Sequence, residues 1–337
     1  MKKLKYGIAV AVLAGVLAVG STGSMAQTLT IGVRAGPESI DTHFTATGTH
    51  AEALKHVFDT LTWSGPGLEI QPRLAESWKA VSADTWEFKL RDDVYFHDGS
   101  KMTADDVAFS LERADKLNSR IHTLLRMESI EVIDPLTIRI KTSDPNPTLP
   151  AALHFAAPLA IISPKSVNDK GEVVAPIGTG PFKFDGYDES THVLTVAKNA
   201  NWWGGDVKLD GIVIKPITDP NTRALSLENG EVDFTVDVPY NEIEGLNGKD
   251  GITVDKFENS RLIYLLFNQK KAPFDDVRVR KAIAYGMDRQ EIVQYVLFGV
   301  GSPAVGIYRP DFYDFLTQPF TENERGRFGL GPSLGTP

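Results

Sequence analysis

Cysteine is absent from the sequence, which has 337 residues. Its absence excludes disulfides, thiol catalysis, zinc ribbons and a lipidated N-terminal cysteine. Basic residues are also scarce, because 35 Lys and Arg stand against 44 Asp and Glu and leave a net charge of -9. Neutralising phosphates requires a basic face, so this balance argues against nucleic acid as a partner.

The sequence also lacks a hydrophobic run long enough to cross a bilayer. The apolar run at 8–19 has 12 residues, whereas a transmembrane helix needs about 20. Lys2, Lys3 and Lys5 precede this run, and Ser24-Met25-Ala26 places small residues before Gln27. This arrangement predicts a signal peptide over residues 1–26. The sequence thus predicts an unlipidated periplasmic protein exported by the general secretory route.

What the sequence does contain is typical of a soluble globular protein. Hydrophobic residues make up 42% and charged residues 23% of the chain, which is the balance of a protein with an ordinary core. The length predicts two lobes or the start of a third. The three lysines of the predicted signal peptide are its only charged residues, so the remaining chain has a net charge of -12.

Hydrophobic periodicity predicts alternating strands and helices along the chain. The expected strands lie near 29–33, 86–90, 129–133, 136–141, 182–187, 192–197, 211–216, 232–236 and 263–267. Helices are expected near 49–60, 220–229, 276–285 and 288–297, and another begins after the capping residue Thr103. The buried face of that helix is expected to contain Val107, Ala108, Leu111 and Ala114. The proline-rich stretch 144–164 leaves room only for short helix.

Two glycine-containing motifs resemble catalytic or phosphate-binding loops. Residues 331–335 fit the G-x-S-x-G pattern, which needs an acid and a histidine further along the chain. The two residues that follow are Thr336 and Pro337, so we interpret the match as chance. Gly178-Thr179-Gly180-Pro181 lacks the Lys-Ser/Thr of a phosphate loop and precedes a predicted strand. We expect a tight backbone turn there.

Clusters of titratable residues raise the question of metal or acid–base chemistry. His43, His50 and His56 are 7 and 6 residues apart, whereas helical zinc ligands are three or four apart. We expect them to be solvated or to pack in turns, and we expect no metal or other cofactor. Asp92-Asp93 and Asp105-Asp106 could form a general acid and base, but acids at strand ends and helix starts are usually turn and cap residues.

Aromatic side chains offer a different kind of site. Trp63, Trp78, Trp86, Trp202 and Trp203 could line a cleft for a small molecule, because ligand pockets combine apolar walls with a few polar groups. Most aromatic residues must belong to the core, and periodicity does not separate the two groups.

Several strings of residues, taken together and in this order after a secretion signal, resemble one protein family. They are Leu74-Ala75-Glu76-Ser77-Trp78, Trp86-Glu87-Phe88-Lys89-Leu90-Arg91, Phe96-His97-Asp98-Gly99, Thr103-Ala104-Asp105-Asp106-Val107, Gly178-Thr179-Gly180-Pro181-Phe182, Asn199-Ala200-Asn201-Trp202-Trp203, Asn229-Gly230-Glu231-Val232-Asp233-Phe234, Phe267-Asn268-Gln269 and the run from Pro273 to Ala282. The sequence resembles the extracytoplasmic solute-binding proteins of ABC importers, family 5, which bind peptides, opines and nickel. The resemblance extends from about Leu29 to Asn323.

This resemblance implies an α/β fold of the periplasmic binding protein type II-like bilobal kind, with an additional inserted lobe. Lobe I would combine residues 27–60 with 180–266, the extra lobe would be 61–179, and the second ligand lobe would begin at 267–323. In such proteins closure of the lobes buries the ligand, and the closed form docks on the permease. The implied partners are a small-molecule or peptide ligand and an ABC permease in the inner membrane, and the protein is expected to be a monomer without catalytic residues.

The resemblance also implies seven ligand-binding residues. They are Ala46, Thr47, Gly48, His122, Asp237, Arg261 and Tyr264. The first three match the segment that meets ligand backbone in peptide-binding relatives, and His122 matches a wall position of the extra lobe. The last three fall where relatives line the cleft.

The C-terminal residues depart from the family pattern. Residues 308–323 still resemble it, but 324–337 contain four Gly and two Pro among 14 residues where relatives have a helix. We therefore expect a truncated or frameshifted product with an incomplete second lobe and an aberrant tail of low order. Such a product would leave the apolar face of Ile283, Ile292, Val293 and Val296 poorly covered and prone to aggregation.

Two other functions remain open from the residues alone. A secreted hydrolase using paired carboxylates would need a carboxylate whose pKa is raised in a cleft. A periplasmic binder of unfolded peptides would bind many sequences weakly, where an importer component binds few tightly.

Overall fold

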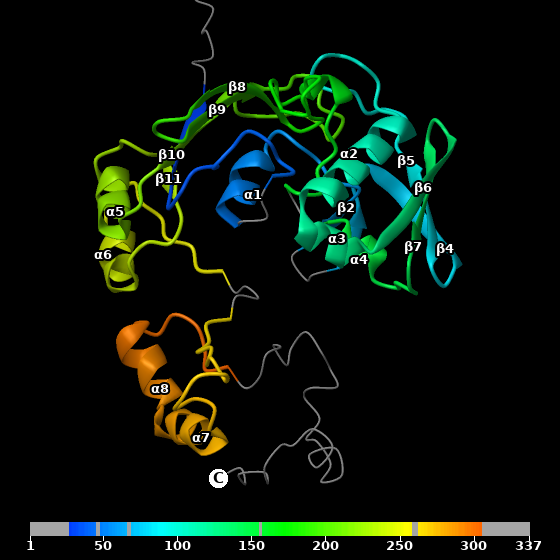
Figure 1. Ribbon diagram of the computed structural model, residues 1–337. Coiled ribbons are helices and arrows are strands. Elements are labelled where there is room, and N and C mark those ends of the chain that lie inside the picture. The colour runs from blue at the N-terminus through cyan, green and yellow to red at the C-terminus, as the bar shows by residue number, and fades with distance from the viewer. Residues whose placement is uncertain (1–26, 45–47, 66–68, 155–156, 258–261, 305–337) are drawn as a thin grey trace, which may run out of the picture.

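The computed structural model describes residues 27–44, 48–65, 69–154, 157–257 and 262–304. Its elements form an arch with one sheet toward each end, and the last two helices lie below it (Figure 1). No helix in these ranges is long and apolar enough to cross a membrane.

The first sheet has five strands and joins the start of the chain to residues far along it. Its strand order is β11-β1-β10-β9-β8. The strands are β1 (Thr28–Val33), β8 (Phe182–Asp188), β9 (Val193–Lys198), β10 (Gly211–Pro216) and β11 (Phe234–Thr235). β1 pairs in parallel with β10 and β11, whereas β8, β9 and β10 pair antiparallel. The predicted strand at 232–236 is thus only two residues long.

Helices connect or flank these strands. They are α1 (Gly48–Leu54), α5 (Pro220–Glu228), η2 (Tyr240–Glu242) and α6 (Ile243–Asn247). Asp219 caps α5 by accepting a hydrogen bond from the Thr222 backbone N–H, and Pro220 occupies its first turn, as the sequence predicts. Gly230 has a φ of 70°, which ends the helix in the left-handed region that favours glycine.

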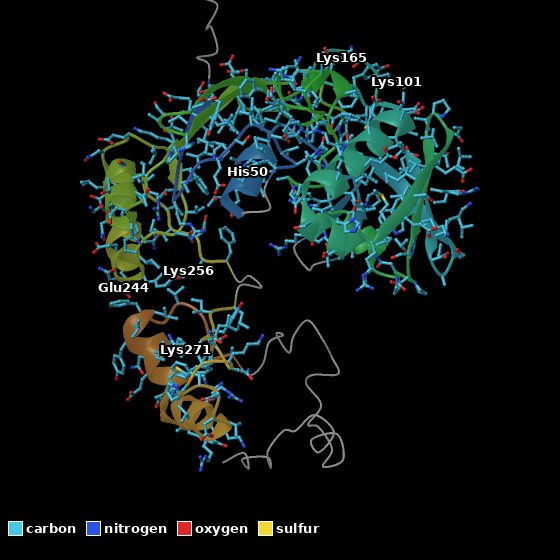
Figure 2. The ribbon with its side chains drawn as sticks, in the orientation of Figure 1. His50, Lys101, Lys165, Glu244, Lys256 and Lys271 are labelled. Carbon is cyan, nitrogen blue, oxygen red and sulfur yellow. The ribbon has the colours of Figure 1, made fainter. Side chains whose placement is uncertain are left out.

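The second sheet lies within residues 61–179, the predicted extra lobe, and has the order β4-β5-β7-β6, all antiparallel. Its strands are β4 (Ala75–Ser82), β5 (Thr85–Leu90), β6 (Met127–Asp134) and β7 (Thr137–Thr142). Around it lie α2 (Ala104–Leu117), α3 (Ser119–Leu125), α4 (Leu149–Ala152), η1 (Pro164–Ser166) and the hairpin of β2 (Thr62–Ser64) with β3 (Ile70–Pro72). Figure 2 shows Lys101 and Lys165 at the upper side of this lobe.

The helix after Thr103 has the N-terminus that its sequence predicts. The side chain of Asp106 accepts hydrogen bonds from the Thr103 backbone N–H at 2.8 Å and from its hydroxyl at 2.9 Å. Val107, Leu111 and Ala114 are fully buried on the inner face of α2. Ala108, which we expected on that face, is only half-buried because it lies at its border.

A crossing segment, His56–Leu61, holds the two sheets together. The carbonyl of His56 accepts a hydrogen bond from Phe182 in β8 of the first sheet, and that of Val57 accepts one from Gly180 just before β8. The carbonyls of Thr60 and Leu61 accept from Leu74 and Ala75 in the extra lobe. The predicted helix at 49–60 is therefore too long: α1 ends at Leu54, residues 55–57 form a turn, and the backbone that follows is bonded to both halves.

The Gly178–Pro181 segment lies against this crossing segment. A Cβ at Gly178 would come within 2.1 Å of the Val57 carbonyl oxygen, and one at Gly180 within 2.6 Å of the Val57 carbonyl carbon. Glycine is required here by close approach of two backbones, and the segment bends between them. This agrees with the expected tight turn rather than with a phosphate loop.

Two hydrophobic clusters form the core. One fills the extra lobe between its sheet and α2, and includes Phe88, Leu111 and Ile138. The other lies on the first sheet beneath α1, and includes Leu54, Phe182 and Ile212. The structure thus has two sheets, each with its own hydrophobic core. The division of the chain into lobes stays a prediction.

The last described part contains α7 (Val277–Gly286), α8 (Arg289–Glu291) and the π-helical turn η3 (Ile292–Val296). The single helix predicted at 288–297 is thus an α-helical turn that continues as a π-helix. None of the residues in these three elements is buried. Ile283, Ile292 and Val293 are half-buried and Val296 is exposed.

The predicted strand at 263–267 is wrong. Ile263, Leu265 and Leu266 are 74%, 60% and 87% exposed, and the stretch has no strand assignment. A strand needs a neighbouring strand for its backbone hydrogen bonds, and none of the described strands pairs with these residues.

Candidate functional site

The carboxyl ends of three parallel strands meet at one edge of the first sheet. β1 ends at Val33, β10 at Pro216 and β11 at Thr235, with β1 between the other two. In open α/β sheets, ligands bind outside the carboxyl ends of the strands where connections diverge. This edge is the candidate functional site, and we call it the carboxyl edge.

Arg223 links the segments that follow two strands of the carboxyl edge. It lies in α5 with 2% of its surface exposed. Its guanidinium donates to the carbonyls of Ile217 at 2.7 Å, Thr218 at 3.0 Å and Asp237 at 2.8 Å. One buried cation thereby joins the segments that leave β10 and β11. No sequence pattern indicates this role, because an arginine in a surface helix is usually solvated.

Replacing Arg223 by Met is expected to lower the free energy of unfolding by about 2 kcal/mol, because three carbonyls lose a charged donor. Urea denaturation measures this. Arg34→Met is the matched control, since Arg34 is exposed just beyond β1, and it should change the value by less than about 0.5 kcal/mol. Equal effects of the two substitutions would contradict the bridging role of Arg223.

The segment that leaves β1 is held by a buried ionic network. Arg113 of α2 donates to both carboxylate oxygens of Asp41, at 2.9 and 2.7 Å, and to Nδ1 of His43 at 3.1 Å. Nε2 of His43 donates to the Ala160 carbonyl at 2.9 Å. The extra lobe thus positions the segment that leads from β1 toward Gly48.

Electrostatics in this network follow from burial and from Arg113. Burial lowers the pKa of His43 to about 4, and the charge of Arg113 acts in the same direction. Burial alone would raise the pKa of Asp41, but the hydrogen bonds and charge of Arg113 outweigh it and lower that pKa. His43 is therefore neutral and Asp41 ionised at pH 7.

The first turn of α1 brings His50 close to the same segment. His50 is fully buried, and its Nε2 lies 3.1 Å from the Asp41 carbonyl oxygen; Figure 2 labels it on α1. Burial lowers its pKa. Its Nδ1 has no hydrogen-bond partner among the described residues. His43 and His56 thus lie in turns, as expected, whereas His50 is buried within α1 and is neither solvated nor in a turn.

Of the predicted ligand residues, Asp237 lies at the carboxyl edge and Gly48 lies on the connection that leaves β1. Gly48 is exposed at the start of α1, on the connection from β1. Asp237 comes two residues after the end of β11, has a φ of 55°, and its carbonyl accepts a hydrogen bond from Arg223. Ala46, Thr47 and Arg261 lie outside the described residues.

The other two predicted residues lie elsewhere. His122 is on α3 in the extra lobe, where its Nδ1 is 3.0 Å from Oδ2 of Asp115 and its side chain is 66% exposed. Tyr264 lies in the exposed stretch before Phe267 and is itself 68% exposed. The structure does not bring His122 or Tyr264 to the carboxyl edge.

The paired acids of the extra lobe have structural partners. Asp93 accepts two hydrogen bonds from Arg91, and Asp106 caps α2. Arg91 lowers the pKa of Asp93, whereas a general acid needs a raised value. These contacts agree with the expected turn and cap roles and do not favour a hydrolase.

Comparison with known protein families identifies the family to which the chain belongs. Residues 69–326 match the model of the bacterial extracellular solute-binding proteins, family 5 Middle. The chain belongs to family 5 of the bacterial extracellular solute-binding proteins. Its members bind solutes for transport, and the predicted fold class is confirmed by solved structures.

A curated relative is the glutathione-binding protein GsiB from Escherichia coli strain K12, 33% identical over 251 residues. The match covers 72% of this chain and 48% of the relative, so the chain spans about half the length of the curated relatives it matches.

Two solved structures illustrate the likeness. A nickel ABC transporter structure from Bacillus halodurans has 30% identity and a TM-score of 0.70, covering 84% of this chain and 58% of that chain. DppA from Helicobacter pylori, in complex with the peptide STSA, has 28% identity and a TM-score of 0.73, with 84% and 61% covered.

Proposed function

We propose that the complete protein is the periplasmic solute-binding component of an ABC importer. It captures a peptide-like or related small solute by hinge closure and delivers it to a permease in the inner membrane. The observation that carries this proposal is the family match over residues 69–326. The carboxyl edge supports it, because it is where an α/β sheet of this kind binds ligands.

Within this proposal, the connection containing Ala46, Thr47 and Gly48 meets the solute at the carboxyl edge, and Asp237 contacts it from the end of β11. Gly48 is exposed and Asp237 is fixed through its backbone on Arg223, so both are presented by rigid elements. His122, Arg261 and Tyr264 contribute from other elements after closure. The protein acts as a monomer and uses no cofactor.

The signal peptide and the absence of cysteine support export to the periplasm without a lipid anchor. We therefore propose that the mature chain begins at Gln27. Binding by closure requires no chemical step, so the protein acts as a carrier and not as a catalyst.

Protein recovered from the periplasmic fraction, with Gln27 as its N-terminal residue, is expected to bind one solute class tightly. Calorimetric titration with glutathione, the peptide STSA and Ni(L-His)2 tests the classes named for relatives. Asp237→Asn keeps a residue that tolerates a positive φ but removes the charge. It should weaken binding of a solute with a free amino group about tenfold.

Asp250→Asn is the matched control, because Asp250 is exposed on the loop after α6, and it should leave affinity unchanged. Retention in the cytoplasm, or turnover of a bound solute, would contradict the proposal. Equal losses with both variants would remove Asp237 from the site while leaving the function itself standing.

A further inference from the structure

A pocket of about 250 Å³ lies where the crossing segment passes the β2–β3 hairpin. Lys55, His56 and Asp59 line it from the chain after α1, and Trp63 and Arg73 line it from the hairpin and its end. Among the described residues, those assigned above to the solute site (Gly48, His122, Asp237 and Tyr264) do not line this pocket. It therefore offers a separate place for a ligand.

Asp59 is the only acid among the described residues of the pocket wall, and its acceptor positions are all occupied. Oδ1 of Asp59 accepts from Nε of Arg73 at 2.9 Å and from Nη2 at 2.6 Å. Oδ2 accepts from the Thr179 hydroxyl and from Nε1 of Trp203, both at 3.0 Å. A carboxylate accepts about four hydrogen bonds, so Asp59 is saturated and cannot bind a cation or a hydroxyl in the pocket.

Hydrogen-bond donors of the pocket, in contrast, remain available to a ligand. Nη1 of Arg73 and the ammonium of Lys55 have no hydrogen-bond or ion-pair partner among the described residues. Burial lowers the pKa of His56 to about 4, and the charge of Lys55 acts in the same direction. His56 is therefore neutral at pH 7. The two cations outnumber the single carboxylate, so the pocket has an excess positive charge.

The pocket also has an aromatic wall. Trp63 is 39% exposed, and the guanidinium carbon of Arg73 lies 5.3 Å from its ring centroid. The same guanidinium lies 5.5 Å from the Trp202 ring and 5.2 Å from the Trp203 ring. Three indoles thus hold the orientation of Arg73, and the exposed surface of Trp63 can take a flat apolar group.

We propose that this pocket binds a small monocarboxylate with a flat apolar group. The carboxylate would lie between Lys55 and Nη1 of Arg73, and the flat group would lie against Trp63. An anion fits because the pocket presents donors and an excess positive charge, and because a charge-assisted hydrogen bond is stronger than a neutral one.

Benzoate is the probe, and benzamide is its neutral isostere. Calorimetric titration of the full chain at pH 7 and low salt should give a Kd for benzoate of about 1 mM, as expected for a ligand of this size. Benzamide should bind at least about tenfold more weakly. Saturation-transfer NMR on benzoate should show contact with aromatic protons of the protein.

Lys55→Gln should weaken benzoate binding about tenfold, because it removes one charged donor. Lys170→Gln is the matched control, since Lys170 is exposed on a turn of the extra lobe. Trp63→Leu provides a second variant and should reduce affinity for benzoate while lowering the melting temperature by no more than about 4 °C, because one of the three indoles on Arg73 is lost.

No benzoate binding at 10 mM (roughly ten times the expected Kd) would overturn the proposal, and so would an unchanged Kd in Lys55→Gln or equal binding of benzamide. Failure here leaves the solute site untouched, because the probes and the mutated residues differ. Failure of the importer proposal, in turn, would not alter the result with benzoate.

Discussion

Substituting Asp59 with Ala is expected to lower the free energy of unfolding by about 4 kcal/mol, the range measured when one partner of a buried ion pair is removed. The Asp59 side chain is fully buried, whereas Arg73 keeps 24% of its side chain exposed. Without the carboxylate, Arg73, Thr179 and Trp203 all lose their acceptor. Urea denaturation followed by tryptophan fluorescence measures the change.

Asp59→Asn gives a sharper test of the same arrangement. Every group that faces the carboxylate is a hydrogen-bond donor. The amide oxygen of Asn can accept from the donors on one side. The amide NH2 group would face the donors on the other side and could not accept from them. We expect this variant to cost about 2 kcal/mol, between the wild type and Asp59→Ala.

The matched control is Asp98→Ala in the predicted extra lobe. Asp98 pairs with Lys165 at 2.7 Å, but the lysine is 66% exposed, so the pair is screened by water. Its loss should cost less than about 1 kcal/mol. If Asp59→Ala and Asp98→Ala cost the same, Asp59 does not hold the two halves of the molecule together.

The elements that the sequence predicted well are those with local causes. The strands of the first sheet show alternation along their own residues, and α2 and α5 begin at their caps, Thr103 and Asp219. A cap, a proline in the first turn and a glycine after the last turn act within a few residues. Such features can be recognised before any tertiary contact is known.

The errors have causes that lie far away in the sequence. Residues 55–60 have helical spacing, but their backbone is bonded to Gly180, Phe182, Ile161 and Leu74, and tertiary pairing overrides periodicity. β4 was not predicted because its residues after Ala75 are mostly exposed and show no two-residue pattern. The stretch 263–267 is apolar enough for a strand but has no pairing partner among the described residues.

The residues of the candidate site also differ in whether the sequence could predict them. Asp237 and Gly48 came from the family resemblance, because side chains in a cleft vary with the ligand and leave no pattern in one sequence. Arg223, Asp41 and Arg113 were not singled out at all. Arg223 contacts Asp237, which is 14 positions away, and Arg113 contacts Asp41 and Gly171, which are 72 and 58 positions away. Only the structure brings these groups together.

Acidification is expected to destabilise the protein between about pH 6.5 and pH 4, before its carboxylates titrate. Burial lowers the pKa of His43, His56 and His97 to about 4 in the native chain. In the unfolded chain each has the ordinary value of about 6.5. The unfolded state therefore binds more protons in this range, and the free energy of unfolding falls as the pH decreases.

Two of these histidines are fixed as neutral tautomers by their hydrogen bonds. Nδ1 of His97 accepts from the Gly178 backbone N–H at 3.3 Å, and its Nε2 donates to the Gly180 carbonyl at 3.0 Å. Nδ1 of His43 accepts in the same way from Arg113. Protonation would add an N–H at each Nδ1, where it would face the N–H group from which that nitrogen now accepts. This unfavourable contact explains why the native state resists protonation.

Each of the three histidines should contribute a loss of about 2 kcal/mol at pH 5, and the loss should level off near pH 4. Urea denaturation at pH 7.5, 6.5, 5.5 and 5.0 measures it. His97→Gln should reduce the dependence on pH by about one third, because the amide keeps one donor and one acceptor but does not titrate. A free energy of unfolding that stays constant from pH 7.5 to pH 5.0 would show that these imidazoles are hydrated in the native protein.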